Sequence, residues 1–175
     1  ELARQRGLGG PGHARDQGAA AAEQTAAQHR VQALEALRDF DLGIWSVHDV
    51  PDSLKKNFRG YALGEDMLEV FSAAKMTVNI HGDFMRYGGN MRLFEAAAVG
   101  IFQIADDLPG VRHWFTEGET IVTFRDLDNL PQKVAYYLSH DDERDAIAQR
   151  AQQYVYQQHT YDQRMARLEE LIAAV

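Results

Sequence analysis

Short apolar runs of strand length alternate with longer segments of helical periodicity, and this alternation constrains the fold more than any other feature of the chain. Strands are expected at residues 42–47, 58–63, 76–81, 101–105 and 119–124. Helices are expected at residues 19–40, 65–75, 90–99, 110–116, 128–139, 141–158 and 160–174. Because such alternation is typical of parallel sheets with helical crossovers, the sequence predicts an α/β, Rossmann-like parallel sheet with helices on both faces.

Composition narrows the class of function. The 175 residues are 45% hydrophobic and carry a formal net charge of −8. A general nucleic-acid binder needs a basic face, so nucleic acid is not an expected partner. No apolar run approaches the roughly 20 residues of a membrane-spanning helix. The chain has no cysteine, which excludes disulfides and thiolate metal sites, and we expect a cytoplasmic location.

The first residues differ from the rest. Residues 1–18 contain few large apolar side chains and are expected to form a flexible, low-complexity tail, followed by one nucleotide-sugar-binding domain at residues 19–175. The stretch GLGGPG at residues 7–12 matches a dinucleotide fingerprint, with Glu35 at the spacing of a ribose contact. A dinucleotide-dependent oxidoreductase would require a buried strand before Gly7, and the polar ELARQR does not supply one.

The stretch GGNMRLFEAAAVG, residues 88–100, places one carboxylate inside a small, apolar helix. Parallel sheets bind ligands beyond the carboxyl ends of their strands, where helices begin. Amides at such a helix start favour phosphate oxygens, and Glu95, one turn further on, could accept hydrogen bonds from two vicinal hydroxyls. The alternative is a surface pair between Glu95 and Arg92.

Several stretches occur together in order: YALGEDMLEVFSAAKMTVNIHGD, NMRLFEAAAVGIFQIADD, and a long segment that runs from FTEGETIVTF to HTYDQRMARLEELI. The motifs that carry the resemblance are R-x-F-E, a G-E-x-x-x-F/Y segment and a terminal H-T-Y-x-x-R. Over about residues 30–175 the chain resembles the C-terminal, donor-binding half of group 1 glycosyltransferases of GT-B architecture. Within that group it is most similar to the spore-maturation-protein-like branch. The resemblance implies two Rossmann-like halves facing a cleft, with this half holding a nucleotide-diphosphate sugar and a missing N-terminal half holding the acceptor.

The resemblance also implies roles for individual residues. Glu95 would grip the nucleotide ribose, and Arg92 with the loop Gly88, Gly89 and Asn90 would lie near the phosphates or the donor sugar. We consider Arg86 as a second cation for the leaving diphosphate, with a solvated loop cation as the alternative, and His81 as a ligand contact or a structural histidine. Many relatives carry an acid eight positions before the ribose-binding glutamate. Here that position is Tyr87, so retention of configuration is not implied.

No catalytic residue is assigned, because the general base is expected on the missing half. No metal site or cofactor is expected, since helix-start amides and cations can stabilise the diphosphate. The D-x-D at Asp126 to Asp128 precedes a helix and is interpreted as a cap. In the resembling enzymes a central first strand immediately precedes the helix expected at 19–40, but nothing apolar occupies that position here. We therefore expect the domain to lack its first strand, with a sheet that either is incomplete in the middle or has its neighbouring strands closed up.

The last helix carries an apolar stripe, which in the resembling enzymes packs toward the N-terminal half; left uncovered, it would favour self-association. The stripe comprises Met165, Leu168, Leu171, Ile172 and Val175. The leading interpretation is therefore the donor-binding part of a glycosyltransferase, inactive as an isolated fragment. The alternative is a non-catalytic Rossmann-like binding or interaction module.

Overall fold

The computed structural model describes residues 27–81 and 87–174. The expected tail, GLGGPG, Arg86 and Val175 lie outside these residues. Residues 27–36 are helical. The elements that follow are β1 (Ile44–Trp45), η1 (Asp52–Asn57), β2 (Phe58–Gly60), α2 (Glu65–Ala73), β3 (Met76–Asn79), α3 (Met91–Val99), β4 (Phe102–Asp106), α4 (Pro109–Trp114), β5 (Val122–Phe124), α5 (Leu130–Ser139), α6 (Asp141–Gln158) and α7 (Tyr161–Ala173).

All paired strands in the described part of the chain are parallel. The main sheet has the order β3-β4-β5, with Met76 opposite Phe102 and Ile104 opposite Val122. A second sheet contains only β1 and β2. The expected Rossmann-like parallel class is therefore confirmed. The described strands form two separate sheets and not one continuous sheet, as expected for a domain whose sheet is incomplete in the middle. The residues that would hold the first strand precede residue 27 and lie outside the described ranges.

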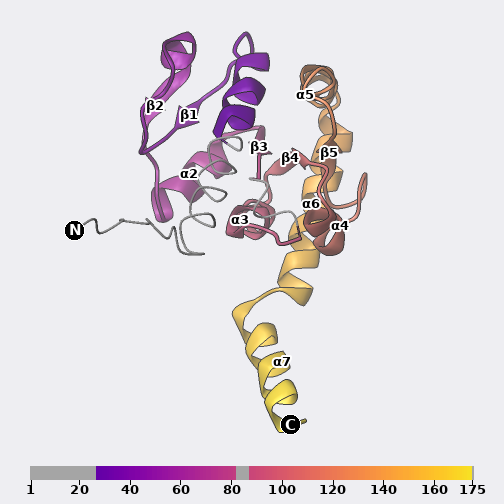
Figure 1. Cartoon of the computed structure of the whole chain (residues 1–175). Helices are drawn as coiled ribbons and strands as arrows, with labels where there is room; N and C mark the ends of the chain where they lie inside the picture. The colour runs from indigo at the N-terminus through magenta and orange to yellow at the C-terminus, as the bar shows by residue number, and fades with distance from the viewer. Residues whose placement is uncertain (1–26, 82–86, 175) are drawn as a thin grey trace, which may run out of the picture.

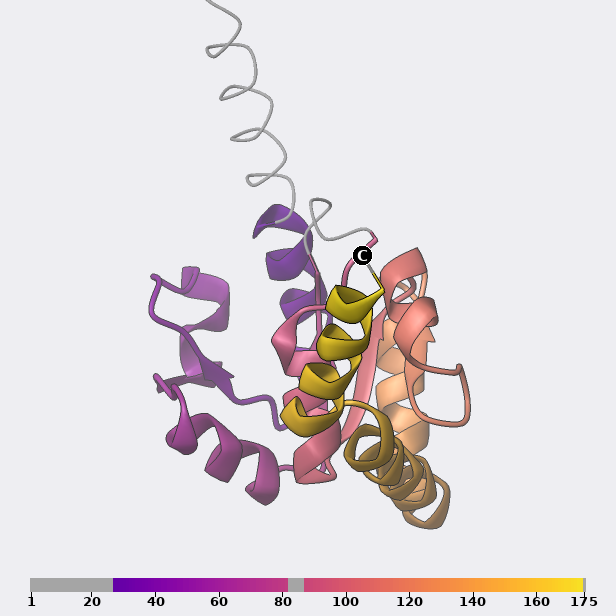
Figure 2. The same ribbon diagram turned by 90° about the horizontal axis from the view of Figure 1, so that it is seen from below.

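The main sheet is covered on both faces, and β4 is buried along its whole length. One face of β4 presents Phe102 and Ile104 to a core cluster that includes Leu37, Leu130 and Ile147. The other cluster combines Ala105 with α3, α4 and α6 side chains, namely Leu93, Ala97, Val111, Ala151 and Val155. In Figure 2 the segment from β1 to α2 lies to the left of the main sheet and α4 to α6 lie to its right, while α6 contributes side chains to both core clusters. The apolar run at 101–105 is thus the central, two-faced strand that the sequence predicts.

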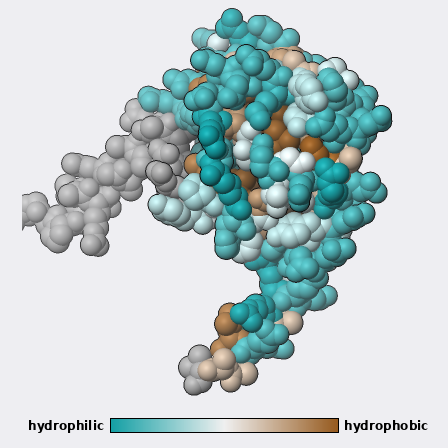
Figure 3. Space-filling view, turned by 90° about the vertical axis from the view of Figure 1, so that its right-hand side faces the viewer, coloured by the Kyte–Doolittle hydropathy of each residue, from teal (hydrophilic) through white to brown (hydrophobic). Residues whose placement is uncertain are grey.

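Two helices contribute little to the core. No side chain of α2 or α7 is fully buried. The helix α7 leaves the end of α6 and extends away from the body of the domain (Figure 1). Hydrophobic residues are visible on this protruding segment in Figure 3, and Met165, Leu168, Leu171 and Ile172 are all exposed. The predicted stripe therefore exists as an uncovered surface in this structure.

The structure corrects several local expectations. The strands are shorter than the apolar runs, and the 3₁₀ helix η1 was not expected. Asp128 does not cap α5, because the cap position is Asn129 and its side chain makes no capping hydrogen bond. The apolar strand around Trp45 and the helical context of Tyr136 predict core packing for both rings, yet they are 40% and 44% exposed. Both lie on elements at the edge of the fold, where an apolar side chain finds neighbours on one side only.

Candidate functional site

The candidate site lies where β3 and β4 end and α3 begins, at the carboxyl edge of the main sheet. Asn90 is the N-cap of α3: its side-chain oxygen accepts a hydrogen bond from the Leu93 backbone N–H at 3.1 Å. Its amide also exchanges two hydrogen bonds, of 3.0 and 2.8 Å, with the amide of Asn79. The last residue of β3 therefore fixes the start of α3. The sequence analysis did not identify Asn79 as a site residue. The one sign of its role in the sequence is that a polar amide side chain stands within an otherwise apolar strand.

The two glycines before Asn90 allow a close approach of neighbouring chain. A Cβ placed on Gly110 of α4 would lie 2.2 Å from the carbonyl oxygen of Gly88. A Cβ on Gly89 would lie 3.0 Å from Leu93 Cδ1 and 3.2 Å from Trp114 Cδ1. Since real Cβ atoms do not tolerate 2.2 Å to backbone, glycine at position 110 is what lets α4 pack against the loop. The loop at 88–90 is consequently held between β3 and α4.

Glu95 and Arg92 do not form the surface pair that we considered as the alternative. The structure records no ion pair between them, nor any hydrogen bond or ion pair from either side chain to another described residue. Arg92 is exposed and Glu95 is half-buried on α3. Glu95 as a residue is thus partly buried, and its carboxylate has no protein donor among the described residues.

His81 lies at the same edge, just beyond β3, and is buried. Its backbone N–H donates to both carboxylate oxygens of Asp106, at 3.2 and 3.1 Å, and its ring Nδ1 lies 2.6 Å from Oδ1. A carboxylate can only accept, so Nδ1 carries the proton. The opposite ring nitrogen, Nε2, is buried and has no hydrogen-bond partner among the residues that the structure describes, which leave out the five that follow His81. One ring nitrogen of His81 therefore has a hydrogen-bond partner, as in a structural histidine, and the other does not. Asp106, which supplies that partner, is added to the candidate site residues.

Asp107, the next residue, organises an ion cluster that sequence reasoning missed. Its side chain is 5% exposed and accepts hydrogen bonds from the guanidinium groups of Arg112 and Arg125. The hydrogen bond from Arg112, followed by that from Arg125, lowers the pKa of Asp107 below its usual 3.8, against the opposing effect of burial. Two cations thus share one carboxylate beside the ends of β4 and β5.

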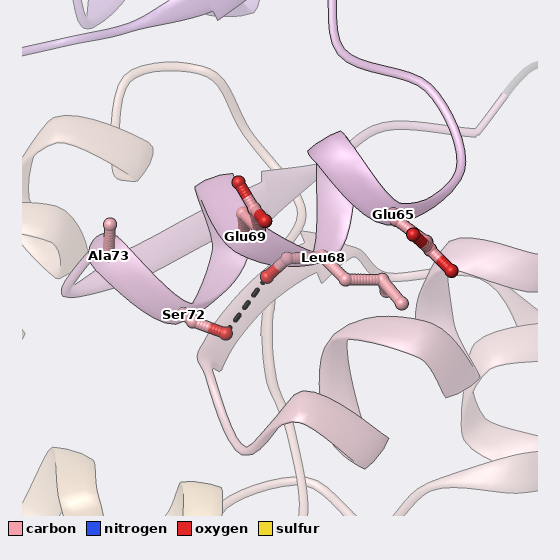
Figure 4. Close-up of a pocket in the computed structure, with 5 residues that line it drawn as sticks. All are labelled: Glu65, Leu68, Glu69, Ser72 and Ala73. Carbon is pink, nitrogen blue, oxygen red and sulfur yellow. Dashed lines mark hydrogen bonds between the residues drawn. The ribbon is translucent and has the colours of Figure 1, made fainter.

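The described residues contain no other feature that competes for a ligand. No three His, Asp or Glu side chains among them come together as metal ligands. An open, shallow pocket lies along α2, lined by Glu65, Leu68, Glu69, Ser72 and Ala73 (Figure 4). Two carboxylates without a cation or an aromatic ring are unsuited to a phosphorylated nucleotide. No helix in the described part of the chain is long and apolar enough to cross a membrane.

Most of the predicted site residues lie at or just after the end of β3. His81 follows this strand, and Gly88, Gly89 and Asn90 form the loop that Asn79 ties to the strand through Asn90. Arg92 and Glu95 lie on α3, which follows the loop. Arg86 lies outside the described residues. Glu35, considered for a dinucleotide, instead accepts a hydrogen bond from the Ser53 hydroxyl at 2.6 Å.

Among the solved structures that share this fold, two serve for comparison. The HepE protein of Anabaena, solved in complex with UDP-glucose, superposes with a TM-score of 0.59 at 14% identity over 70% of this chain. A glycosyltransferase from Rickettsia africae superposes with a TM-score of 0.62 at 15% identity over 81% of this chain. The chain spans 35% and 42% of the lengths of those two proteins.

Sequence comparison assigns the family. No curated protein matches the chain significantly. The model of one family, described as glycosyl transferase-like, matches residues 24–170, which include every described element except the end of α7. This chain therefore belongs to the glycosyl transferase-like family.

Proposed function

We propose that the chain is the C-terminal, donor-binding half of a GT-B glycosyltransferase of the spore-maturation-protein-like branch, and that it binds a nucleotide-diphosphate sugar. The observation that carries the proposal is Glu95: a half-buried carboxylate on α3, directly behind the glycine loop, with no protein donor among the described residues. A carboxylate in that state is suited to accept hydrogen bonds from a ligand. The HepE protein, which shares the fold, was solved with UDP-glucose bound.

The proposed contacts use the residues at this edge of the sheet and follow the resemblance to group 1 glycosyltransferases. Glu95 accepts hydrogen bonds from the two ribose hydroxyls. The amides that open α3 face the diphosphate, because helix N-termini attract anions. Gly88 and Gly89 allow the ligand close to the backbone, and Asn90 keeps the helix start in place. Arg92 supplies an exposed cation on the first turn of α3. Arg86, which lies outside the described residues, is the candidate for a second cation.

His81 supplies a buried ring nitrogen at the same edge. With Nδ1 held by Asp106, only Nε2 is free to contact a ligand. It accepts a hydrogen bond from a hydroxyl when the ring is neutral and donates one to a phosphate oxygen when the ring is protonated.

The chemistry assigned to this half is stabilisation of the leaving group. Sugar transfer breaks the bond between the anomeric carbon and the diphosphate, and negative charge accumulates on the diphosphate oxygens. Helix-start amides and guanidinium groups stabilise that charge without requiring a metal ion. Acceptor binding and the general base belong to an N-terminal half, so this part alone binds donor but does not transfer sugar.

The uncovered stripe of α7 fits the same proposal. The described members of the stripe, Met165, Leu168, Leu171 and Ile172, are between 46% and 67% exposed. Exposed apolar stripes on helices mark interaction surfaces. The N-terminal half is the proposed partner of this stripe, and in its absence two copies of the chain would associate through it.

Calorimetric titration with uridine, guanosine and adenosine diphosphate sugars tests the proposal. One nucleotide class is expected to bind. Glu95→Ala is expected to raise the Kd of that nucleotide sugar by about 10- to 100-fold, because hydrogen bonds to a charged group contribute about 1.5–3 kcal/mol. The exposed Glu69 of α2 provides the control variant Glu69→Ala, which should bind as the unmodified chain does. Circular dichroism must show that all three proteins are folded.

Failure of a folded chain to bind any of these donors would contradict the proposal and favour a non-catalytic Rossmann-like module. Tyr87, in the position where many relatives carry an acid, is the feature that motivates this alternative.

A further inference from the structure

The corner between α6 and α7 is built on a group of aromatic rings. Phe94 of α3 and Trp114 of α4 meet edge to face with their centroids 5.7 Å apart. His159, which links α6 to α7, lies 5.2 Å from the Phe94 ring and 5.4 Å from the Trp114 ring. His159 Nε2 is also 2.9 Å from the Tyr154 hydroxyl. Three helices therefore converge on the start of α7.

Arg164, in the first turn of α7, closes this group. Its guanidinium carbon lies 5.1 Å from the centroid of Phe94 and 5.5 Å from that of Trp114. One of its terminal nitrogens is 3.4 Å from His159 Nδ1. A planar guanidinium can stack on aromatic faces in a way that an ammonium cannot. Because α7 has no fully buried side chain, this contact is a principal attachment of the helix to the body of the domain.

One of the two rings under Arg164 contacts the candidate site, and the other belongs to the helix that carries Glu95. The indole of Trp114 lies against the loop, since a Cβ on Gly89 would be 3.2 Å from Trp114 Cδ1. Phe94 immediately precedes Glu95 on α3 and meets Trp114 edge to face. A shift of Trp114 would therefore act on Gly89 directly, and a shift of α3 at Phe94 would act on Glu95 through the helix backbone.

We propose that Arg164 is a positioning residue for the donor site: by holding Trp114 and Phe94 in place, it couples the attachment of α7 to the shape of the loop at 88–90. The inference rests on the proposed function. Within the HTYDQR segment, the cap by Thr160 is predicted by the sequence and confirmed by the structure, whereas the role of His159 and Arg164 in attaching the helix is seen only in the fold. By linkage, donor binding must in turn strengthen the attachment of α7.

Two measurements on the whole chain test the coupling. The first needs no ligand: hydrogen exchange of the backbone amides at residues 88–95 is compared in the unmodified chain, Arg164→Ala and Arg164→Lys. The second is titration with UDP-glucose, followed by Trp114 fluorescence in a Trp45→Phe background, since the chain has two tryptophans. Arg167→Ala is the matched control, because Arg167 lies on the same helix but pairs only with the exposed Glu170 in the structure.

Arg164→Ala is expected to accelerate exchange at residues 88–95 and to weaken UDP-glucose binding about tenfold. Arg164→Lys should fall between it and the unmodified chain, and Arg167→Ala should change neither. The inference is overturned if exchange at the loop is the same in Arg164→Ala, if binding is undiminished, or if Arg167→Ala has an equal effect. A denaturation curve for each variant shows whether it folds, and so distinguishes a local effect on the loop from misfolding. If the unmodified chain binds no donor while the exchange result holds, the proposed function fails and the mechanical coupling between α7 and the loop stands.

Discussion

Asp106 holds His81 by both its backbone and its ring: the carboxylate accepts the His81 backbone N–H at 3.1 and 3.2 Å and lies 2.6 Å from Nδ1. The two residues are 25 positions apart in the chain and lie at the ends of neighbouring strands. The carboxylate thus extends the pairing of β3 and β4 beyond the last backbone register pair, Asn79 with Ala105. It also determines which ring nitrogen of His81 is free.

Replacing this carboxylate tests its structural contribution. Asp106→Asn keeps one acceptor oxygen, which can still face both N–H groups of His81, but it removes the negative charge and turns an amide NH₂ toward the His81 backbone N–H. Hydrogen bonds to a charged group contribute about 1.5–3 kcal/mol and neutral ones about 0.5–1.5 kcal/mol, so we expect the free energy of unfolding in urea to fall by about 1–2 kcal/mol. Asp128→Asn is the control, since Asp128 is exposed and makes no recorded side-chain hydrogen bond. Equal stability of the two variants would show that the Asp106 contact contributes nothing.

Gly110→Ala should disturb the packing of α4 against the loop at 88–90. The new Cβ would meet the Gly88 backbone at 2.2 Å, and backbone cannot rotate away as a side chain can. We expect a loss of about 1–3 kcal/mol or more in the free energy of unfolding, together with loss of donor binding. Gly89→Ala, whose nearest neighbours are side-chain atoms at 3.0 and 3.2 Å, should be milder. The reverse order in chemical denaturation would contradict this interpretation of the loop.

Acid should loosen the start of α7 through His159. Burial, and then the nearby charge of Arg164, lower the pKa of His159 below 6.5. A histidine with a lowered pKa binds protons more readily in the unfolded state, so its contribution to stability is present above pH 6.5 and declines as the pH falls toward the folded-state pKa. Denaturation measured between pH 7.5 and 5 should show this decline, and His159→Asn should reduce it. His48→Asn, at an exposed loop position, should leave the pH profile as it is.

Thr160→Ala removes one half of a capping box. The Thr160 hydroxyl accepts from the Gln163 backbone N–H at 3.4 Å, and the Gln163 side chain accepts from the Thr160 N–H at 2.8 Å. Loss of such a cap costs about 1 kcal/mol of helix stability. Since α7 has no fully buried side chain, the expected result is faster amide exchange within α7 with little change in global unfolding. Ser72→Ala, at the end of α2, is the control; a large fall in global stability in Thr160→Ala would show that α7 unfolds with the core.

The order and type of most elements follow from local patterns. The run at 101–105 has no polar alternation apart from Gln103, which is typical of a strand buried on both faces, and β4 is buried throughout. Thr160 followed by Gln163 predicts the start of α7, because the cap is made within four residues. The position of the glycine loop between a strand and a helix likewise follows from the sequence. These features depend on neighbours along the chain, so the chain itself encodes them.

Contacts between distant segments depend on strand register and helix packing, which no local pattern specifies. Asn79 meets Asn90, Asp106 meets His81, Gly110 meets Gly88, and Arg164 stacks on Phe94 only because the folded sheet brings its carboxyl ends, α4 and the α6–α7 corner together. The exposure of Trp45 and the failure of Asp128 to cap α5 have the same origin, since each depends on where a neighbouring element ends in space. The sequence by itself determined the elements and the placement of Glu95 behind a glycine loop; the tertiary structure decided which side chains hold that loop, because contact distances are set by packing.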